Sequence, residues 1–540
     1  VFGRPTATKL TADLNLDYRL DEADLQYMRK VLLKEEYLVL KGADVNSDSQ
    51  TDIRDLAALL KQREEEQQTQ ESISGVTYYV DSAAVSDGTG LTPEQPLCTL
   101  EQVNALSLQP GDRVLLKRGS KFHGSLIVNA SGTKDQPILI GAYGEGALPV
   151  IHGDGTSKAA VYGENVSYIT VKDLEVTNAG DTAKQHRGIY FIAKSRSISG
   201  ITIEGCYVHN VDSLVEKVTV ELPGLGDHHW TGGILVRARS EEFCDDAANL
   251  RKVTVNDVLI QNNRVEACAQ TGIMAGGSTV SGRYPSLGIC IRGNYVGGCY
   301  GDGIIVMGSH GAVLEGNVSD GSASSAPVDH NCAGIWVAES SGTLFQYNES
   351  RNMKENNDGQ GFDVDNGCTG TLLQYNYSHD NYGGALLLMQ KANGSVTIRY
   401  NISQNDGRYA INVAVHTDKA PYVTINAHHN IVYTDASTKM IEFLGNYKKF
   451  AASNVGSMSC NIFYGTGQAI LSDRAIDSYL DFDGNIYYQM TPSAKDRAAK
   501  TADPQFADPG GAGDGILSLS AYVFESASPY ADSGFKVPVK

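Results

Sequence analysis

The chain has 540 residues, of which 41% are apolar, and carries a formal net charge of −19. This apolar content suffices for a hydrophobic core and argues against global disorder, and no apolar run reaches the ~18 residues of a membrane-spanning helix. A pI near 5.1 argues against a nucleic-acid partner, because phosphate binding requires a basic surface. The chain has 57 glycines among its 540 residues, a larger share than the usual ~7%. This surplus predicts many tight turns within a folded body.

Two short segments near the start of the chain share one spacing of acidic and amide residues. Oxygen-bearing side chains fall at positions 1, 3, 5, 9 and 12 of each segment, and apolar residues at helical spacing follow. This spacing surrounds a hard cation with oxygen ligands, whereas ordinary turns and helix caps are the alternative. Two segments in register favour two Ca²⁺ ions. The expected ligands are Asp13, Asn15, Asp17, Asp21 and Asp24 in the first loop, and Asp44, Asn46, Asp48, Asp52 and Asp55 in the second.

These two loops resemble a type I dockerin module, and the resemblance covers residues 10–63. It implies a cohesin-bearing scaffold protein as the partner, and a protein that is secreted and either extracellular or attached to the cell surface. The match departs at loop position 6, where glycine is usual and this chain has Tyr18 and Ser49. We expect residues 1–63 to form this module and residues 64–75 to form a linker.

From residue 76 onward, short apolar segments alternate with Gly, Asn and Asp, and two markers recur. One marker is a Gly followed by an apolar residue. The other is an Asn that recurs 23 to 31 residues after the preceding Asn of the series. Such a repeat is typical of the coils of a parallel β-solenoid, in which Asn at one bend bonds to its copy in the next coil. The glycines are 188, 233, 272, 303, 334, 361 and 384, and the asparagines are 263, 294, 317, 348, 376, 401, 430, 461 and 485.

Four further segments resemble the right-handed parallel β-helix superfamily of pectate-lyase-like, carbohydrate-active proteins. Residues 78–82 (YYVDS) and 109–116 (QPGDRVLL) resemble its N-terminal part, and residues 502–506 (ADPQF) and 528–533 (SPYADS) its C-terminal part. We therefore expect a mainly β protein with a single-stranded β-helix over residues 76–540. Residues 76–160 would form its starting region and residues 490–540 a C-terminal cap. The fold alone leaves the reaction open, because it carries many activities.

Side chains along each Gly-led strand alternate between the inside and the outside of the coil. The first and third residues after Gly are expected inside, and the second and fourth outside. One strand then carries two outward carboxylates, Asp363 and Asp365, whose spacing of roughly 6.5–7 Å along a strand is compatible with a glycosidase pair. The other expected outward pairs are Leu235/Arg237, Met274/Gly276, Ile305/Met307, Trp336/Ala338, Leu386/Leu388 and Asn412/Ala414.

Several neighbours of this carboxylate pair are candidate site residues. Trp336 on the preceding coil is expected to be exposed, so that a sugar ring stacks on it, and Asp302 and Glu339 flank the same face. Because carboxylates in strand interiors are disfavoured, we interpret Asp363, Asp365, Asp302 and Glu339 as catalytic candidates, with solvated or cation-binding acids as the alternative. The candidate substrate-binding residues are Trp336, Arg237, Lys391, His330, His228 and His229, the histidines lying in long insertions.

Three functions remain open at this point. The first is a glycoside hydrolase acting on a plant-type polysaccharide or oligosaccharide, in line with a resemblance to the β-helix hydrolases that include a xylanase and an α-L-fucosidase. The second is a pectate-type lyase, since residues 358–365 (DGQGFDVD) faintly resemble a calcium-binding lyase motif, although Gln360 breaks the match. The third is a non-catalytic extracellular or filament-forming protein. The hydrolase is favoured, and no cofactor is assigned to the β-helix itself.

Overall fold

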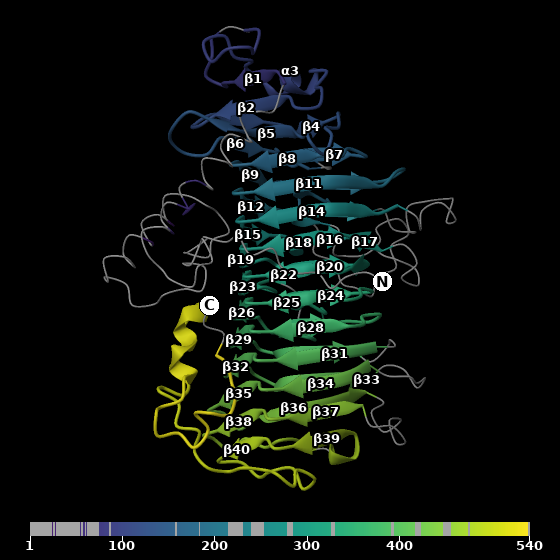
Figure 1. Ribbon diagram of the computed structural model, residues 1–540. Coiled ribbons are helices and arrows are strands. Elements are labelled where there is room, and N and C mark those ends of the chain that lie inside the picture. Colours follow the sequence, from purple (N-terminus) through teal and green to yellow (C-terminus); the bar gives the residue numbers. More distant parts are fainter. Residues whose placement is uncertain are drawn as a thin grey trace.

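The structure is a computed structural model. It describes residues 75–537 except 86–87, 157–158, 183, 214–230, 239–252, 278–284, 326–329, 390–393, 416–422, 446–454 and 474–475, together with Asp24, Met28, Asp55, Ala58, Leu59 and Lys61. Within this part, strands stack into a tall column of coils (Figure 1). Successive strands of the chain visit three sheets in turn, which we name A, B and C, and neighbouring coils pair in parallel. The expected parallel β-helix is confirmed.

The described strands form three long sheets and one short one. Sheet A contains β1 (Thr77–Val80), β2 (Arg113–Lys117), β5 (Ile138–Tyr143), β8 (Ile169–Lys172), β11 (Ile198–Glu204), β14 (Val255–Gln261), β18 (Ile289–Arg292), β22 (Val313–Glu315), β25 (Leu344–Gln346), β28 (Thr371–Gln374), β31 (Gly394–Arg399), β34 (Val423–His428), β37 (Gly456–Ser459) and β39 (Leu480–Asp483). Sheet B contains β3 (Lys121–His123), β6 (Val150–His152), β9 (Glu175–Asn178), β12 (Tyr207–Val211), β15 (Arg264–Cys268), β19 (Tyr295–Gly297), β23 (Val318–Asp320), β26 (Glu349–Arg351), β29 (Tyr377–His379), β32 (Ile402–Gln404), β35 (Ile431–Thr434), β38 (Ile462–Gly465) and β40 (Ile486–Tyr488).

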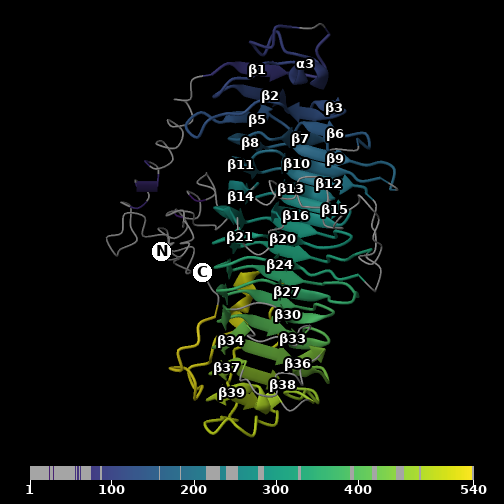
Figure 2. The ribbon, with the colours of Figure 1, turned by 90° about the vertical axis from the view of Figure 1, so that its right-hand side faces the viewer.

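Sheet C carries the outer face on which the candidate carboxylates lie, and Figure 2 shows its strands one below another. It contains β4 (Leu126–Val128), β7 (Val161–Glu164), β10 (Arg187–Ala193), β13 (Gly232–Ala238), β16 (Thr271–Gly276), β20 (Ile304–Met307), β24 (Ile335–Ala338), β27 (Gln360–Val364), β30 (Gly384–Met389), β33 (Tyr409–Val415) and β36 (Lys439–Gly445). The remaining described elements are β17 (Ser286–Leu287), β21 (Ser309–His310), α3 (Leu100–Asn104) and the 3₁₀ helices η6 (Ile476–Ser478) and η7 (Ile516–Tyr522). None of the helices in the described residues could span a membrane.

A row of glycines marks the corner at which the chain enters sheet C. A Cβ added at Gly334 would lie 2.1 Å from Ser350 Oγ and 2.6 Å from the Gly361 carbonyl oxygen, so any larger residue displaces a neighbouring coil. The glycine marker therefore reports a real close approach of sheets B and C. It fixes the inward positions correctly for β20, β24 and β27, since Ile304, Val306, Ile335, Val337, Phe362 and Val364 all lie in the central core.

The glycine marker predicted the wrong inward and outward positions for β30. Gly384 pairs with Gln360 and Leu386 with Phe362, so Ala385 takes the position that glycine holds in the coils above. Leu386 and Leu388 consequently point into the core rather than outward. The residue beside Asp363 is instead Leu387. Ala385 occupies this corner position in the coil of β30, and the adjacent Gly384 was mistaken for the marker.

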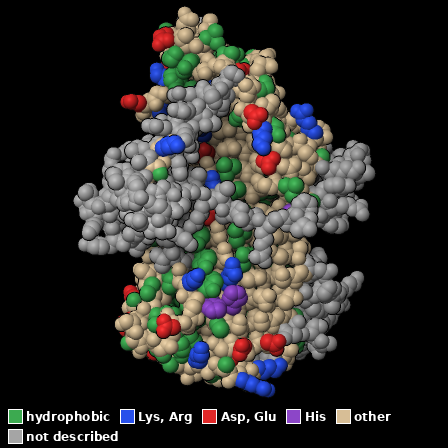
Figure 3. All heavy atoms as spheres, in the orientation of Figure 1, with side chains coloured by type: hydrophobic (Ala, Val, Ile, Leu, Met, Phe, Trp, Pro, Cys, Tyr) green, Lys and Arg blue, Asp and Glu red, His purple; other side chains and the backbone are tan. Residues whose placement is uncertain are grey.

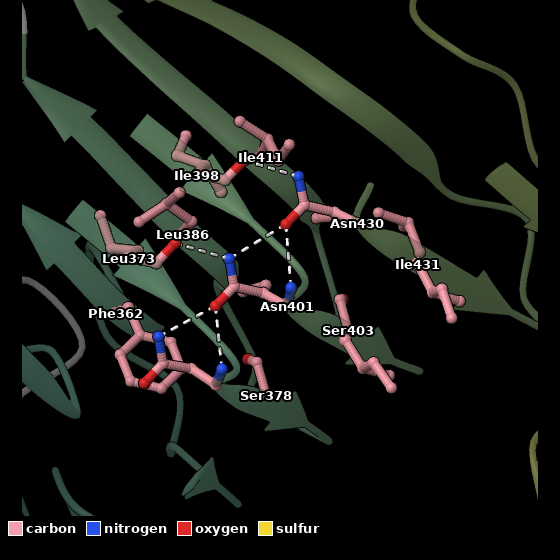
Figure 4. A pocket seen from close by; sticks show the side chains of 15 residues that line it. Phe362, Leu373, Ser378, Leu386, Ile398, Asn401, Ser403, Ile411, Asn430 and Ile431 are labelled. Atoms are coloured by element: carbon pink, nitrogen blue, oxygen red, sulfur yellow. Dashed lines mark hydrogen bonds between the residues drawn. The ribbon is translucent and has the colours of Figure 1, made fainter. Parts of the chain in front are cut away.

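A ladder of asparagines joins the coils at the corner between sheets A and B. Each backbone N–H and each side-chain NH₂ donates to the carboxamide oxygen of the next Asn, as between Asn401 and Asn430 at 3.0 Å (Figure 4). The ladder includes all nine predicted asparagines and ends on Asp496, whose Oδ2 accepts from Asn485 Nδ2 at 2.8 Å. It thereby satisfies buried polar backbone at each bend. The pocket of Figure 4 lies inside the coil, lined partly by Ala385 and Ala410.

The C-terminal segment returns along the outside of sheet B. Leu519 and Tyr522 of η7 pack in a cluster with Tyr433 and Tyr464, and Tyr522 donates a hydrogen bond to Gln404 Oε1 at 2.8 Å. Higher up, the backbone N–H of Gly515 donates to both carboxylate oxygens of the buried Glu349, at 3.0 and 3.1 Å. On the face shown in Figure 3, acidic and basic side chains are interspersed rather than gathered into one basic area.

Candidate functional site

Four carboxylates gather on the outer side of sheet C, in the middle of the column. Asp363 lies in β27 and Asp365 directly follows it, whereas Asp302 and Asp358 precede β20 and β27 at the corner with sheet B. Their charges act on one another, because Asp365, Asp358 and Asp302 all raise the pKa of Asp363. The structure therefore brings together three of the four predicted catalytic residues and adds Asp358.

Trp336 forms one wall of this cluster. It pairs with Asp363 across neighbouring strands, and its indole Nε1 donates a hydrogen bond to Asp302 Oδ1 at 2.8 Å. The backbone N–H of Ala333 donates to the same oxygen at 2.9 Å. The expectation that Trp336 is exposed was wrong, since only 5% of it is accessible. It packs in a separate cluster outside the central core, with Ile305 and Met274 on the coils above.

Asp363 is also buried, with only 6% of its surface accessible. Burial is the main reason why its pKa lies well above the ordinary value of 3.8, and the charges of Asp365, Asp358 and Asp302 add to this shift. Within the described part of the chain, Asp363 Oδ1 has no hydrogen-bond partner. A protonated acid held in this way can donate a hydrogen bond, but it is a poor nucleophile.

Asp358 was not among the predicted site residues, and the structure makes it a strong candidate. Burial, reinforced by the charges of Asp365 and Asp302, raises its pKa to about 7, although Arg408 lowers it. Its loop is fixed by the buried Asn356, whose Oδ1 accepts the N–H of Asp358 at 2.9 Å and that of Cys332 at 3.3 Å. Arg408 Nη1 donates to the carbonyl of Asn357 at 3.1 Å, which holds this cation beside the loop.

Asp365 and Glu339 lie at the C-terminal ends of sheet C strands, where they directly follow β27 and β24. Asp365 is half-buried, its N–H donates to the Val337 carbonyl at 2.9 Å, and its Oδ1 accepts the N–H of Asn366 at 2.5 Å. Glu339 is half-buried in a left-handed conformation with φ of 50°. Its charge acts, with those of Asp365 and Asp363, on the buried thiol of Cys368, whose pKa is raised mainly by burial. Glu339 therefore lies near the cluster, and its role in the site stays a prediction.

The predicted substrate-binding residues are only partly brought to this site. His330 is buried beside the Asp358 loop, where its carbonyl accepts the N–H of Asn357 at 2.8 Å. Arg237 is fully buried on β13. It lies four strands from Asp365 in register, or roughly 19 Å at the usual strand spacing. Lys391, His228 and His229 lie outside the described residues.

The predicted calcium loops fall mostly outside the described residues. Only the last acid of each loop, Asp24 and Asp55, is described, and both are fully buried helical residues. Met28 and Leu59, one helical turn further on, are buried as well. The other eight predicted ligands, Asp13, Asn15, Asp17, Asp21, Asp44, Asn46, Asp48 and Asp52, lie outside the described residues.

Comparisons with known proteins bear on the fold and on the proteins that this chain resembles. The sequence profile described as "Right handed beta helix region" matches residues 228–427, a stretch that contains all four carboxylates. The chain is 30% identical over 473 residues to a lacto-N-biosidase of Bifidobacterium longum subsp. longum. The match covers 71% of this chain but only 29% of that protein, so the chain spans less than a third of this relative's length.

Two crystal structures of a GH136 lacto-N-biosidase from Eubacterium ramulus are also similar to this chain. The selenomethionine derivative superposes with a TM-score of 0.60 and 27% identity over 77% of this chain and 72% of that one. The native protein gives a TM-score of 0.57 and 27% identity over 73% and 70%. The chain is thus a right-handed parallel β-helix, similar over most of its length to lacto-N-biosidases.

Proposed function

We propose that this protein is a glycoside hydrolase in which Asp358 donates a proton to the glycosidic oxygen and Asp365 is the second carboxylate. The observation that carries the proposal is the pKa of Asp358, which burial and the charges of Asp365 and Asp302 raise to about 7. An acid with a pKa near the working pH is protonated before the reaction and gives up its proton readily during it.

Asp365 complements Asp358 because the two environments differ. Asp365 is half-buried, and its Oδ1 accepts the N–H of Asn366. The charged carboxylate would attack the anomeric carbon or activate a water molecule. Asp363 is less suited to either role because it is buried, and this burial is the main reason why its pKa is raised. We assign Asp363 and Asp302 to shaping the site, with Trp336 as its apolar wall.

The likeness to lacto-N-biosidases supports both the reaction class and a first choice of substrate. An oligosaccharide that carries a lacto-N-biosyl unit is the substrate to test first, because two similar proteins carry that name. The alternative substrates are the plant-type polysaccharides expected from the sequence. Either class would bind the same outer face of sheet C.

The test compares two leaving groups in two variants. Asp358→Asn should cut kcat/KM at least 100-fold on p-nitrophenyl lacto-N-bioside but much less on the 2,4-dinitrophenyl analogue, whose leaving group needs no proton. Asp365→Asn should lose activity on both. Asp483→Asn, an exposed acid on β39, is the matched control and should behave as the wild type. Full activity in either site variant would overturn the assignment, and NMR of the first-formed anomer would separate retention from inversion.

The polysaccharide lyase remains the alternative reaction and is tested in parallel. A lyase needs a basic residue beside the proton that it removes, yet the neighbour of Asp363 on the next coil is Leu387. Incubation with pectin, xylan and arabinan should release reducing ends without the absorbance of an unsaturated uronate. That absorbance would favour the lyase. Neither signal on any substrate, together with an unaltered Asp365→Asn variant, would favour a structural protein.

We also propose that residues 10–63 bind two Ca²⁺ ions and tether a secreted enzyme to a cohesin-bearing scaffold. The shared spacing of oxygen-bearing side chains in the two loops supports this proposal. Asp24 and Asp55, the last acid of each loop, are buried helical residues. Calorimetric titration of the full chain with Ca²⁺ should show two sites, and the Asp24→Ala/Asp55→Ala variant should lose both. Unchanged binding in this variant would refute the calcium assignment.

A further inference from the structure

A cluster of two histidines and one aspartate lies near the N-terminal end of the β-helix, away from the carboxylate site. His123 ends β3, His152 ends β6, and Asp154 follows two residues later. Asp154 Oδ1 lies 2.7 Å from His152 Nδ1 and 3.0 Å from His123 Nδ1. One donor atom from each of the three residues lies within 4.8 Å of the other two, and all three side chains are accessible to solvent.

The fold itself places these groups together. His123 and His152 are direct partners on neighbouring parallel strands, so their side chains leave the same face one strand spacing apart. Their rings stack with centroids 5.5 Å apart and an angle of 29° between planes. Asp154 adopts a left-handed conformation with φ of 54°, which is unfavourable for most residues but tolerated by Asp. This turn brings its carboxylate back to the two rings.

The chemistry of the donor set matches a transition metal. Two imidazole nitrogens and one carboxylate oxygen suit Zn²⁺, whereas Ca²⁺ prefers oxygen ligands alone. Bonds of about 2.0–2.1 Å in a tetrahedral zinc site put neighbouring donor atoms roughly 3.3 Å apart. The contacts of 2.7 and 3.0 Å between Asp154 and the two imidazoles would therefore widen by a few tenths of an ångström when the ion replaces their hydrogen bonds.

We propose that His123, His152 and Asp154 bind one divalent transition-metal ion, with zinc preferred, and that water completes its coordination. The site joins β3 to the turn after β6 and so connects two coils near the start of the column. It is independent of the proposed glycoside hydrolysis and of the proposed calcium loops, because it uses none of their residues.

A second cluster of similar composition shows what distinguishes this one. Glu349, His379 and Asp514 also bring their donor atoms together. There, however, Arg351 Nη1 lies 2.5 Å from Glu349 Oε1, and Arg351 Nη2 lies 3.4 Å from Asp514 Oδ2. A guanidinium ion that already neutralises the carboxylates repels a metal ion. Asp154, by contrast, pairs with the two imidazoles and with no guanidinium or ammonium group among the described residues.

The experiment is a titration of the full chain, stripped with chelator and saturated with Ca²⁺, with Zn²⁺ by calorimetry and with Co²⁺ by visible absorption. The wild type should bind one equivalent more than His152→Ala, and Asp154→Asn should bind that equivalent at least tenfold more weakly. Bound Co²⁺ should give d–d absorption that both variants lose.

His209→Ala is the control, because His209 on the same sheet contacts only one carboxylate, Glu175 at 3.2 Å, among the described ion pairs. Equal stoichiometry and affinity in the wild type and both site variants would overturn the proposal. Thermal unfolding without metal, unchanged in each variant, confirms that it folds.

Discussion

The indole Nε1 of Trp336 and the Oδ1 of Asp302, on adjacent coils, are joined by a 2.8 Å hydrogen bond in which both residues are buried. Trp336→Phe keeps an aromatic ring but removes the donor. We expect it to lower the free energy of unfolding by about 1–3 kcal/mol, the cost of depriving a buried carboxylate of a partner, and to reduce kcat/KM. A double-mutant cycle with Asp302→Asn measures the coupling. Additive effects of the two substitutions would show that this hydrogen bond positions nothing.

The pH dependence of activity should respond to Arg408. Its positive charge lowers the pKa of Asp358, which still stands at about 7. Arg408→Gln removes that charge, so the pKa of Asp358 should rise and activity should persist to higher pH. The alkaline limb of the kcat/KM profile should move up by about 0.5–1 pH unit. Arg497→Gln, another exposed arginine, should leave the limb in place. A downward shift in Arg408→Gln contradicts the role of Asp358 as acid.

Ionised Asp358 should lower the free energy of unfolding at neutral pH. Its pKa in the folded protein, about 7, lies above the ordinary 3.8, so the carboxyl favours the folded state below pH 3.8 and this contribution is lost as the pH rises through 7. Asp358→Asn carries no such charge. It should therefore be more stable than the wild type by about 2–4 kcal/mol at pH 8, and by little near pH 4. Calorimetric unfolding across this range, with Asp483→Asn as control, checks the prediction. Equal stability at pH 8 would mean that Asp358 is not strained by its surroundings.

The asparagine ladder should be intolerant of single breaks. Asn348 Oδ1 accepts from the backbone and the side chain of Asn317, and Asn348 Nδ2 donates to the Leu314 carbonyl. Asn348→Ala leaves these buried groups without their partners and should destabilise the protein by roughly 2–4 kcal/mol. The midpoint of urea unfolding measures the loss. Asn426→Ala, which removes an exposed contact to Ser457 on sheet A, should change stability by less than about 0.5 kcal/mol.

The fold was predictable because each coil must repeat the same local solution. Asn at one bend has to match Asn in the next coil, and glycine at the other corner has to admit the close approach of Ser350. Both requirements leave a mark at intervals that can be counted in the sequence. The same marks set the alternation that placed Asp363 and Asp365 on the outer face.

The rest of the site depends on features without such a period. Asp358 acts through its burial and the charge of Asp365, and a lone Asp before a Gly is indistinguishable from an ordinary turn residue in sequence. The available signal was its place at the start of residues 358–365 (DGQGFDVD), the segment that faintly resembles a calcium-binding lyase motif. The burial of Trp336 follows from packing outside the central core, which strand alternation does not report. Leu386 was misplaced because its coil carries Ala385 where the six coils from β10 to β27 carry glycine.

The return of the C-terminal segment along sheet B has a mechanical consequence. The end coil of a solenoid has a neighbour on one side only and is the natural place for unravelling to begin. Here the bond between Gly515 and Glu349 links residues 166 positions apart, and η7 packs across the coils between them. The C-terminal segment therefore holds the last coils together from the outside of sheet B. A pulling force applied at the C-terminus would have to detach this segment from sheet B before the last coils could unfold.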